Sequence, residues 1–531
     1  MSAAGDKPRS AARSAGIVGL AVMSSRILGL VREMVFASLF GAGRSLDAFL
    51  VAFRTPNLLR DLFAEGALST AFVTTFSKKI ATEGEESAWS LANKVATLAA
   101  VFLSGVVLLG ILFAPIIIKI MAPGFDPEKL QLTILLARIM YPFILLVSLA
   151  ALAMGMLNAR HVFGMPAMAS TFFNLGSILA GVGIGWWLDP SWGSRALVGL
   201  AIGTLVGGLL QLVVQFPSLA RVGFRFRPDL AWRDPGVRQV LSLMGPAVVA
   251  ASAVQVNVLI NGIFASQLGD GAVSWLQIAF RLMQFPLGVF GVAIATVTLP
   301  MVARSAALGN MGEFRTTLAR GMRLAFFLTI PSATGLILLA NPIISLLYER
   351  GRFTAEMTAQ TAGALQFYAL GLVAYSALKV LTPAFYAIDR RHTPMVIGFL
   401  SIGTNALLNW ILTFRMGLGH RGLALSTGVV AVVNFAVLYG LMWRHLGRLE
   451  NRALLGFLVR TLLATGALGA VCGWGGAVAF QEWPTLGLVG RAVRLFAVIG
   501  AAGVAFFGAA FLLGVQEMRE VGEVLRRRLR R

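Results

Sequence analysis

The sequence predicts an all-α polytopic membrane protein of about 14 transmembrane helices, with two six-helix lobes around a central cavity and two extra C-terminal helices. Composition is the first observation: 57% of the 531 residues are hydrophobic and 13% are charged, whereas soluble proteins carry about a quarter charged residues. The second is the length of the apolar runs, which suits helices rather than barrel strands of roughly ten residues. The third is an internal repeat.

Breaks marked by glycine, proline and charge separate the predicted spans. They lie near 15–40, 45–77, 88–121, 130–158, 161–187, 195–216, 237–268, 272–303, 314–347, 357–388, 393–415, 421–445, 453–480 and 487–515. The predicted domains are a cytoplasmic N-terminus (1–14), an N-lobe (15–220), a cytoplasmic linker (221–236), a C-lobe (237–447), helices 13 and 14 (448–515) and a basic cytoplasmic tail (516–531).

The net charge of +22 is explained by topology, without nucleic acid as a partner. Basic residues gather in alternate loops and in the C-terminal tail, which predicts that both termini are cytoplasmic. The loop ERGRF at 349–353 is an exception, because it carries two arginines on the opposite side. The single cysteine, Cys472, excludes an intramolecular disulfide.

The repeat relates the first loop to the seventh. Residues 35–54 read VFASLFGAGRSLDAFLVAFR, and residues 263–281 read IFASQLGDGAVSWLQIAFR. Aligning the shared AFR places Arg54 on Arg281, an offset of 227 residues, which also pairs Phe63 with Phe290 and Ser69 with Thr296. Gly66 then falls on Ala293. Six predicted helices separate the copies, so this is a parallel repeat of the kind found in transporters.

Charged residues are concentrated in the first two helices, between Ser24 and Lys79. A charge at membrane depth costs about 2.5–3.5 kcal/mol on insertion scales and usually faces a cavity or pathway. Snorkelling side chains and structural ion pairs are the alternative. The charges in this stretch are Arg26, Arg32, Glu33, Asp47, Arg54, Arg60, Asp61 and Glu65.

The spacing of these charges favours an anion-binding cavity. Arg26 and Glu33 share nearly one helical face, and Asp47, Arg54 and Asp61 recur every seven residues. Arg54 could equally pair with those two acids, whereas Arg281 has no acid in its own predicted helix. Arginine suits phosphate because its planar fork binds two oxygens and stays charged. Lys379 is a further predicted cavity charge.

We find no metal, nucleophile or phosphate-loop motif, so a transporter is predicted rather than an enzyme, without a cofactor. The four histidines lie near predicted helix ends, and the glycines favour close helix packing.

Four segments carry a resemblance to a known family. They read SSRILGLVRE, GAGRSLDAFLVAFRTPNLLRDLFAEGALSTAFVTTF, AFRLMQFPLGVFGVAIATVTLP and ALKVLTPAFYAIDRRHTP. Here the chain resembles the MurJ (MviN) family of lipid II flippases, in the multidrug/oligosaccharidyl-lipid/polysaccharide exporter superfamily. The resemblance implies a bacterial inner-membrane protein with a twelve-helix core. It also implies that the last two helices form a groove for the polyprenyl tail of lipid II, the undecaprenyl-diphosphate-linked peptidoglycan precursor.

The family's functional arginines correspond here to Arg26, Arg32, Arg60 and Arg281, with Glu33 and Asp47 as acidic neighbours. Some members carry aspartates of a sodium site on the seventh and eleventh helices. This chain has asparagine at the matching positions, so a degenerate sodium site would comprise Asn261, Asn405 and Asn409.

The resemblance implies alternating-access flipping of lipid II from the cytoplasmic to the periplasmic leaflet, for cell-wall synthesis and cell shape. Membrane lipids and the cell-wall synthesis or division machinery are further candidate partners. The alternatives are export of another lipid-linked saccharide, cation-coupled drug antiport within the same superfamily, and a non-transporting scaffold. An antiporter for cationic drugs should have an acidic and aromatic cavity rather than one lined by arginine.

Overall fold

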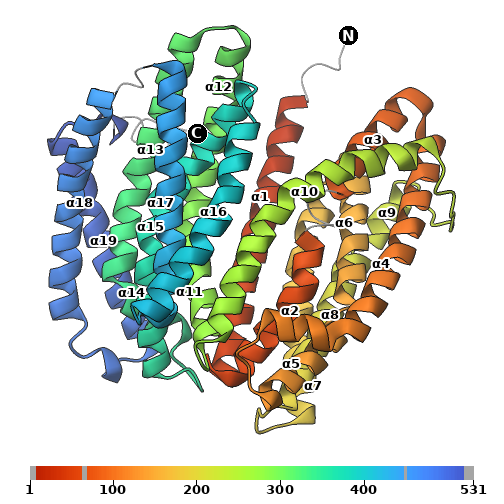
Figure 1. Cartoon of the computed structure of the whole chain (residues 1–531), viewed down its shortest axis with the longest axis horizontal. Coiled ribbons are helices and arrows are strands. Elements are labelled where there is room, and N and C mark those ends of the chain that lie inside the picture. Colours follow the sequence, from red (N-terminus) through yellow and green to blue (C-terminus); the bar gives the residue numbers. More distant parts are fainter. Residues whose placement is uncertain (1–6, 62–67, 448–450, 519–531) are drawn as a thin grey trace. The chain divides into compact units, whose positions relative to one another are not determined.

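The computed structural model describes residues 7–61, 68–447 and 451–518, and its regular elements there are all helices (Figure 1). By contact density the chain divides into two units, Met1–Val273 and Ser274–Arg531. The seventh predicted span, at 237–268, falls within the first unit.

The helices of the first unit are α1 (Lys7–Phe40), α2 (Arg44–Arg60), α3 (Ser69–Glu83), α4 (Glu85–Met121), α5 (Pro127–Met140), α6 (Phe143–Ala159), α7 (Gly164–Leu188), α8 (Ala196–Val213), α9 (Phe216–Arg221) and α10 (Pro235–Ser266). At the boundary α11 (Ala272–Pro286) begins, followed by the π-helical turn Leu287–Gly291, α12 (Val292–Ala307), α13 (Met311–Leu338), α14 (Ala340–Tyr348), α15 (Ala355–Ala387), α16 (His392–Trp410), the π-helical turn Ile411–Arg415, α17 (Gly419–Leu446), α18 (Asn451–Ala479), a short 3₁₀ turn (Trp483–Thr485) and α19 (Leu488–Leu512).

The predicted all-α membrane fold is confirmed, with helices over all fourteen spans. In the described residues, 11 helical spans are long and apolar enough to cross a membrane by themselves. The first, second and seventh predicted spans are not among these 11. In the first, the charges Arg26, Arg32 and Glu33 interrupt the apolar stretch, and in the second, α2 has only 17 residues.

Several helices begin at a side-chain cap that the sequence carries visibly. Asp126 precedes Pro127 and accepts hydrogen bonds from the N–H groups of Glu128 and Lys129. Asp234 caps α10 in the same way, ahead of Pro235. A carboxylate at this position satisfies helix N–H groups that otherwise lack partners, and proline fits the first turn because it needs no donor there.

The break predicted between the spans at 15–40 and 45–77 is confirmed at Gly41–Gly43, where Gly41 has a φ of 68°. The two copies of the repeat also break at equivalent places. Helix α2 ends at Arg60 with Asp61 in a π-helical turn, and the offset of 227 carries Asp61 to Gly288, inside the π-helical turn after α11. Phe63, Glu65 and Gly66 lie outside the described residues.

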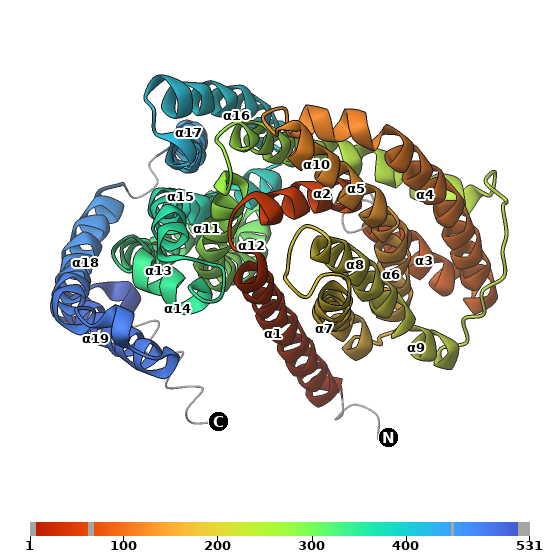
Figure 2. The same ribbon diagram turned by 90° about the horizontal axis from the view of Figure 1, so that it is seen from below.

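Helices α7 and α8 lie side by side through glycine (Figure 2). Gly199 faces the backbone of Gly185, and Gly203 faces the backbone of Gly181, so closely that a Cβ at either position in α8 would overlap it. Small residues spaced by four let two helix backbones touch, which confirms that these glycines serve packing.

We expect Gly203→Ala to destabilise the protein by about 1–3 kcal/mol, the usual cost of overpacking. Gly183→Ala is the matched control, because a Cβ there would meet no atom within 4 Å. It should be neutral or stabilising, since alanine favours the helix by up to about 1 kcal/mol. Thermal unfolding in detergent compares the two; equal shifts would contradict this account of the interface.

The loop at 349–353, which carries two arginines against the charge pattern of the other loops, has a local explanation. Arg350 donates to the carbonyl oxygens of Leu346 and Leu347, both at 2.8 Å. These belong to the last turn of α14, whose carbonyls have no helical partner. At least one of the two arginines in this loop therefore completes a helix end.

Candidate functional site

The arginines of α1 differ in their surroundings. Arg26 is exposed, whereas Arg32 and Glu33 are half-buried. The guanidinium of Arg32 lies over the ring of Phe173 in α7, with its carbon 5.0 Å from the ring centroid. An aromatic face holds a guanidinium without neutralising its charge, so this stacking positions Arg32 while leaving it cationic.

The charges at the end of α2 form a cluster with α10. Arg60 binds the carboxylate of Asp61 at 2.9 Å. Gln255 of α10 donates to the other oxygen of Asp61 at 3.4 Å. Arg54, one turn and a half earlier, lies against α10 as well, because a Cβ on Gly262 would come within 2.6 Å of its Nη1 atom.

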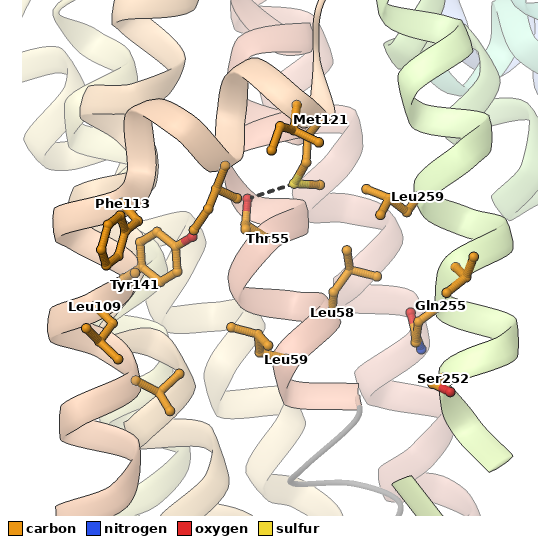
Figure 3. A pocket seen from close by; sticks show the side chains of 15 residues that line it. Thr55, Leu58, Leu59, Leu109, Phe113, Met121, Tyr141, Ser252, Gln255 and Leu259 are labelled. Atoms are coloured by element: carbon orange, nitrogen blue, oxygen red, sulfur yellow. Dashed lines mark hydrogen bonds between the residues drawn. The ribbon is translucent and has the colours of Figure 1, made fainter. Parts of the chain in front are cut away.

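An apolar cavity of about 510 Å³ adjoins this cluster (Figure 3). Its walls come from α2, α4, α10 and Tyr141, and they are mostly leucine, isoleucine, valine and phenylalanine. Gln255 and Ser252 lie on the α10 side, and Phe113 and Leu109 on the α4 side. The cavity is suited to hydrocarbon, and it is linked to the predicted ligand Arg60 through Gln255, which lines the cavity and binds Asp61.

Asp47 has a different environment from Arg54 and Asp61, the residues that follow it at seven-residue intervals. It is fully buried and binds Lys129 of α5 at 3.1 Å. The backbone N–H of Gly271 donates to the same carboxylate oxygen at 2.7 Å. Lys129 is itself 2% exposed, and it also binds Asp270 at 2.8 Å and lies over the ring of Phe125. Asp47 therefore ties α2 to α5 and to the loop that follows α10.

Arg44 extends this network toward solvent. It binds Asp126 through two parallel bonds of 2.6 Å and Glu128 at 3.1 Å. The sequence pattern does not identify Arg44, Lys129 or Asp270 as partners of this cluster. The signal available was the Asp-Pro start of α5 with a lysine on its first turn, but nothing in the spacing connects that turn with Asp47.

The pairing with Arg44 gives the loop a defined pH response. Its hydrogen bond to Asp126 lowers the pKa of that carboxyl from 3.8 to about 2. A lowered pKa stabilises the fold at pH values above 3.8, and the effect is lost as the pH falls towards 2. We expect the melting temperature in detergent to fall less steeply between pH 4 and 2 in Arg44→Gln than in the wild type. Parallel curves would contradict this.

In the second unit, Arg281 is half-buried in α11 and Lys379 is exposed on α15. Phe280, beside Arg281, packs its ring against Tyr368 of α15 with centroids 5.3 Å apart. The predicted phosphate ligands thus fall into two sets, Arg26, Arg32 and Arg60 in the first unit and Arg281 in the second.

The asparagines of the predicted degenerate sodium site are also divided. Asn261 is half-buried in the first unit, whereas Asn405 and Asn409 are fully buried in α16. Asn409 accepts a hydrogen bond from Ser426, and both amide atoms of Asn405 are buried without a hydrogen-bond partner. Within the described residues, no group of three or more His, Cys, Asp or Glu side chains could hold a metal ion.

A family model described as "Lipid II flippase MurJ" matches residues 36–493. The chain belongs to the MurJ family. One MurJ relative, "Lipid II flippase MurJ" of Burkholderia cenocepacia, is 36% identical over 504 residues, covering 92% of this chain and 95% of that protein. "Probable lipid II flippase MurJ" of Vibrio cholerae is 35% identical over 514 residues, covering 95% and 96%.

Solved structures agree with the MurJ assignment. The chain is similar to "Lipid II flippase MurJ, inward closed conformation", with a TM-score of 0.75 and 26% identity over 92% of this chain and 98% of that one. An inward-facing multidrug resistance transporter of the MATE family matches with a TM-score of 0.66 and 15% identity, covering 80% and 96%, and shares the fold alone. This MurJ-family chain is therefore a multi-pass membrane protein, and its fold is the one shared by the MurJ and MATE structures.

Proposed function

We propose that this protein flips lipid II from the cytoplasmic to the periplasmic leaflet of the bacterial inner membrane. Membership of the MurJ family over residues 36–493 is the observation that carries this proposal. The protein acts as a transporter rather than an enzyme, and both of its termini are cytoplasmic. Its role is the supply of precursor for peptidoglycan synthesis, alongside the cell-wall synthesis or division machinery.

We infer that Arg26, Arg32, Arg60 and Arg281 bind the diphosphate and headgroup. The stacking of Arg32 on Phe173 supports this, since an aromatic face positions a guanidinium and does not itself neutralise the charge. Arg60 pairs with Asp61, and Gln255, which binds the same carboxylate, lines an apolar cavity suited to hydrocarbon of the same ligand. The net charge around these arginines is set by four further charged side chains, Glu33, Arg54, Asp61 and Lys379.

The polyprenyl tail stays in apolar surroundings throughout. Helices α18 and α19 pack on each other (Figure 1). Both expose large apolar side chains along their lengths. These helices form the proposed groove for the tail. Because the groove is apolar, the tail does not have to cross a polar surface. The two lobes then carry only the headgroup across.

Transport is driven by the membrane potential in this proposal. An inside-negative potential favours outward movement of negative charge by about 2.3 kcal/mol per charge per 100 mV. Asparagine replaces the sodium-site aspartates, and a neutral amide attracts sodium less strongly than a carboxylate does. Collapse of the potential in vesicles should therefore slow flipping; transport that needs sodium but not potential would contradict this coupling.

Depletion of the protein in its host tests the function. Leaflet-resolved labelling should show lipid II accumulating in the cytoplasmic leaflet, with recovery on re-expression of the wild type. The same assay with other lipid-linked saccharides tests the rival exporter function. Normal externalisation of lipid II during depletion would overturn the proposal.

A further inference from the structure

A second cavity, of about 270 Å³, lies in the second unit where α18 begins and α19 ends. It is lined by Arg323 of α13, by Gly456, Phe457 and Arg460 of α18, and by Val515 and Glu517 after α19. None of these residues is among the arginines predicted to bind the headgroup, although Gly456, Phe457 and Arg460 lie on α18, one of the two helices of the proposed tail groove. Two arginines in one small cavity of a membrane protein need a physical reason.

One arginine is held in place by a buried acid. Arg323 is 15% exposed, and its Nε atom binds a carboxylate oxygen of Glu517 at 2.8 Å, where Glu517 is 5% exposed. Arg460 is exposed and donates to the carbonyl oxygen of Gly514 at 3.4 Å. Among the described residues no carboxylate lies within ion-pair distance of Arg460, so the lining there carries two positive charges against one negative charge.

The cavity is positioned to meet lipid. Gly456, Val459, Arg460 and Leu463 follow the spacing of one helical face, and all four are exposed. Val459 and Leu463 are 50% and 60% exposed, as expected for side chains that contact the hydrocarbon of the bilayer. Arg460 therefore lies on a lipid-facing surface of α18, beside an opening that Gly456 leaves without a side chain.

The depth of Arg460 suits a headgroup. Helix α18 has 29 residues, which span about 44 Å, whereas the hydrocarbon core is about 30 Å thick. Arg460 is about 14 Å along the helix from its first residue. In a centred helix this level is about 7 Å inside the hydrocarbon, a depth from which a long arginine side chain reaches the phosphate layer by extending outward.

We propose that this cavity binds the phosphodiester headgroup of an anionic phospholipid. Arg460 and Arg323 provide the cationic lining, because guanidinium forks match phosphate oxygens. The buried Glu517 orients Arg323, and Phe457 and Val515 form the apolar wall beside the glycerol and the start of the acyl chains. With the proposed topology, this lipid comes from the cytoplasmic leaflet. This site is distinct from the lipid II transport function, because the phospholipid bound there is not carried across the membrane.

Native mass spectrometry of the full-length protein tests this site, with 1-palmitoyl-2-oleoyl phosphatidylglycerol as the probe and the matching phosphatidylcholine as the neutral comparison. We expect phosphatidylglycerol to bind more tightly, and Arg460→Gln to weaken its binding by about tenfold, the factor that corresponds to about 1.4 kcal/mol. Gly456→Leu should weaken it similarly by filling the cavity, and its Cβ meets no atom within 4 Å, so the fold should tolerate it.

Matched controls separate this site from general charge effects. Gly466→Leu adds the same side chain to open space on the same helix, and Arg444→Gln removes an exposed arginine from the last turn of α17. Both should bind phosphatidylglycerol as the wild type does, and so should the substrate-site variant Arg281→Ala. Wild-type binding by both Arg460→Gln and Gly456→Leu would overturn the proposal. Equal binding of the two lipids, or displacement by millimolar inorganic phosphate, would overturn the assignment to an anionic lipid headgroup.

Discussion

Arg281→Ala is expected to reduce lipid II flipping by roughly tenfold to a hundredfold, because a hydrogen bond to a charged group contributes about 1.5–3 kcal/mol. Arg32→Ala should have an effect of similar size. The measurement is the rate at which lipid II appears in the outer leaflet of cells that express only the variant. Protein levels should stay close to those of the wild type, since both side chains are half-buried rather than part of the core.

Two variants make this result specific. Arg281→Lys keeps the charge but removes the fork, so it should recover only part of the activity. Arg444→Ala removes an exposed arginine of α17 outside the proposed site and should flip lipid II normally. Normal externalisation in Arg281→Ala, with the variant present at wild-type level, would contradict a role for Arg281 in binding the diphosphate.

Asp47→Leu is expected to lower the free energy of unfolding by about 3 kcal/mol. Loss of one partner of a buried ion pair costs about 3–5 kcal/mol, and the lower end applies because Asp270 still faces Lys129 at 2.8 Å. The N–H of Gly271 loses its acceptor as well. Thermal and denaturant unfolding in detergent measure the change.

A double-mutant cycle identifies the cause. Asp47→Leu with Lys129→Met replaces the pair by apolar side chains, which is often close to neutral. The double variant should therefore be more stable than Asp47→Leu alone. If the changes in unfolding free energy of the two single variants simply add in the double variant, the cost of leaving Lys129 buried without Asp47 does not explain the destabilisation.

Much of this fold was predictable because membrane helices leave a strong signal. Long apolar runs separated by glycine and proline predicted all fourteen helical spans, and Gly41–Gly43 predicted the first joint. The breaks within spans were harder to predict. The predicted helix at 130–158 is interrupted at Tyr141 and Pro142, and the one at 272–303 contains a π-helical turn. Hydropathy does not register such turns, because the side chains remain apolar through them.

The polar interactions were less predictable, since they depend on distant partners. A seven-residue spacing grouped Asp47 with Arg54 and Asp61, but Asp47 pairs with Lys129, 82 residues later. Glu517 and Arg323 are likewise joined across 194 residues. Helical spacing shows which side chains share a face, whereas the partner of a buried charge depends on tertiary packing. The roles of Arg26, Arg32, Arg60 and Arg281 in binding remain predictions.

The glycine contact between α7 and α8 has a mechanical consequence. Where backbone touches backbone, at Gly181 with Gly203 and at Gly185 with Gly199, there are no rotamers that could change to accommodate sliding. Shear between these two helices would need the backbones to separate first. We therefore expect α7 and α8 to move as one rigid unit during transport. Bending of the chain must then occur elsewhere, such as at the π-helical turn after α11.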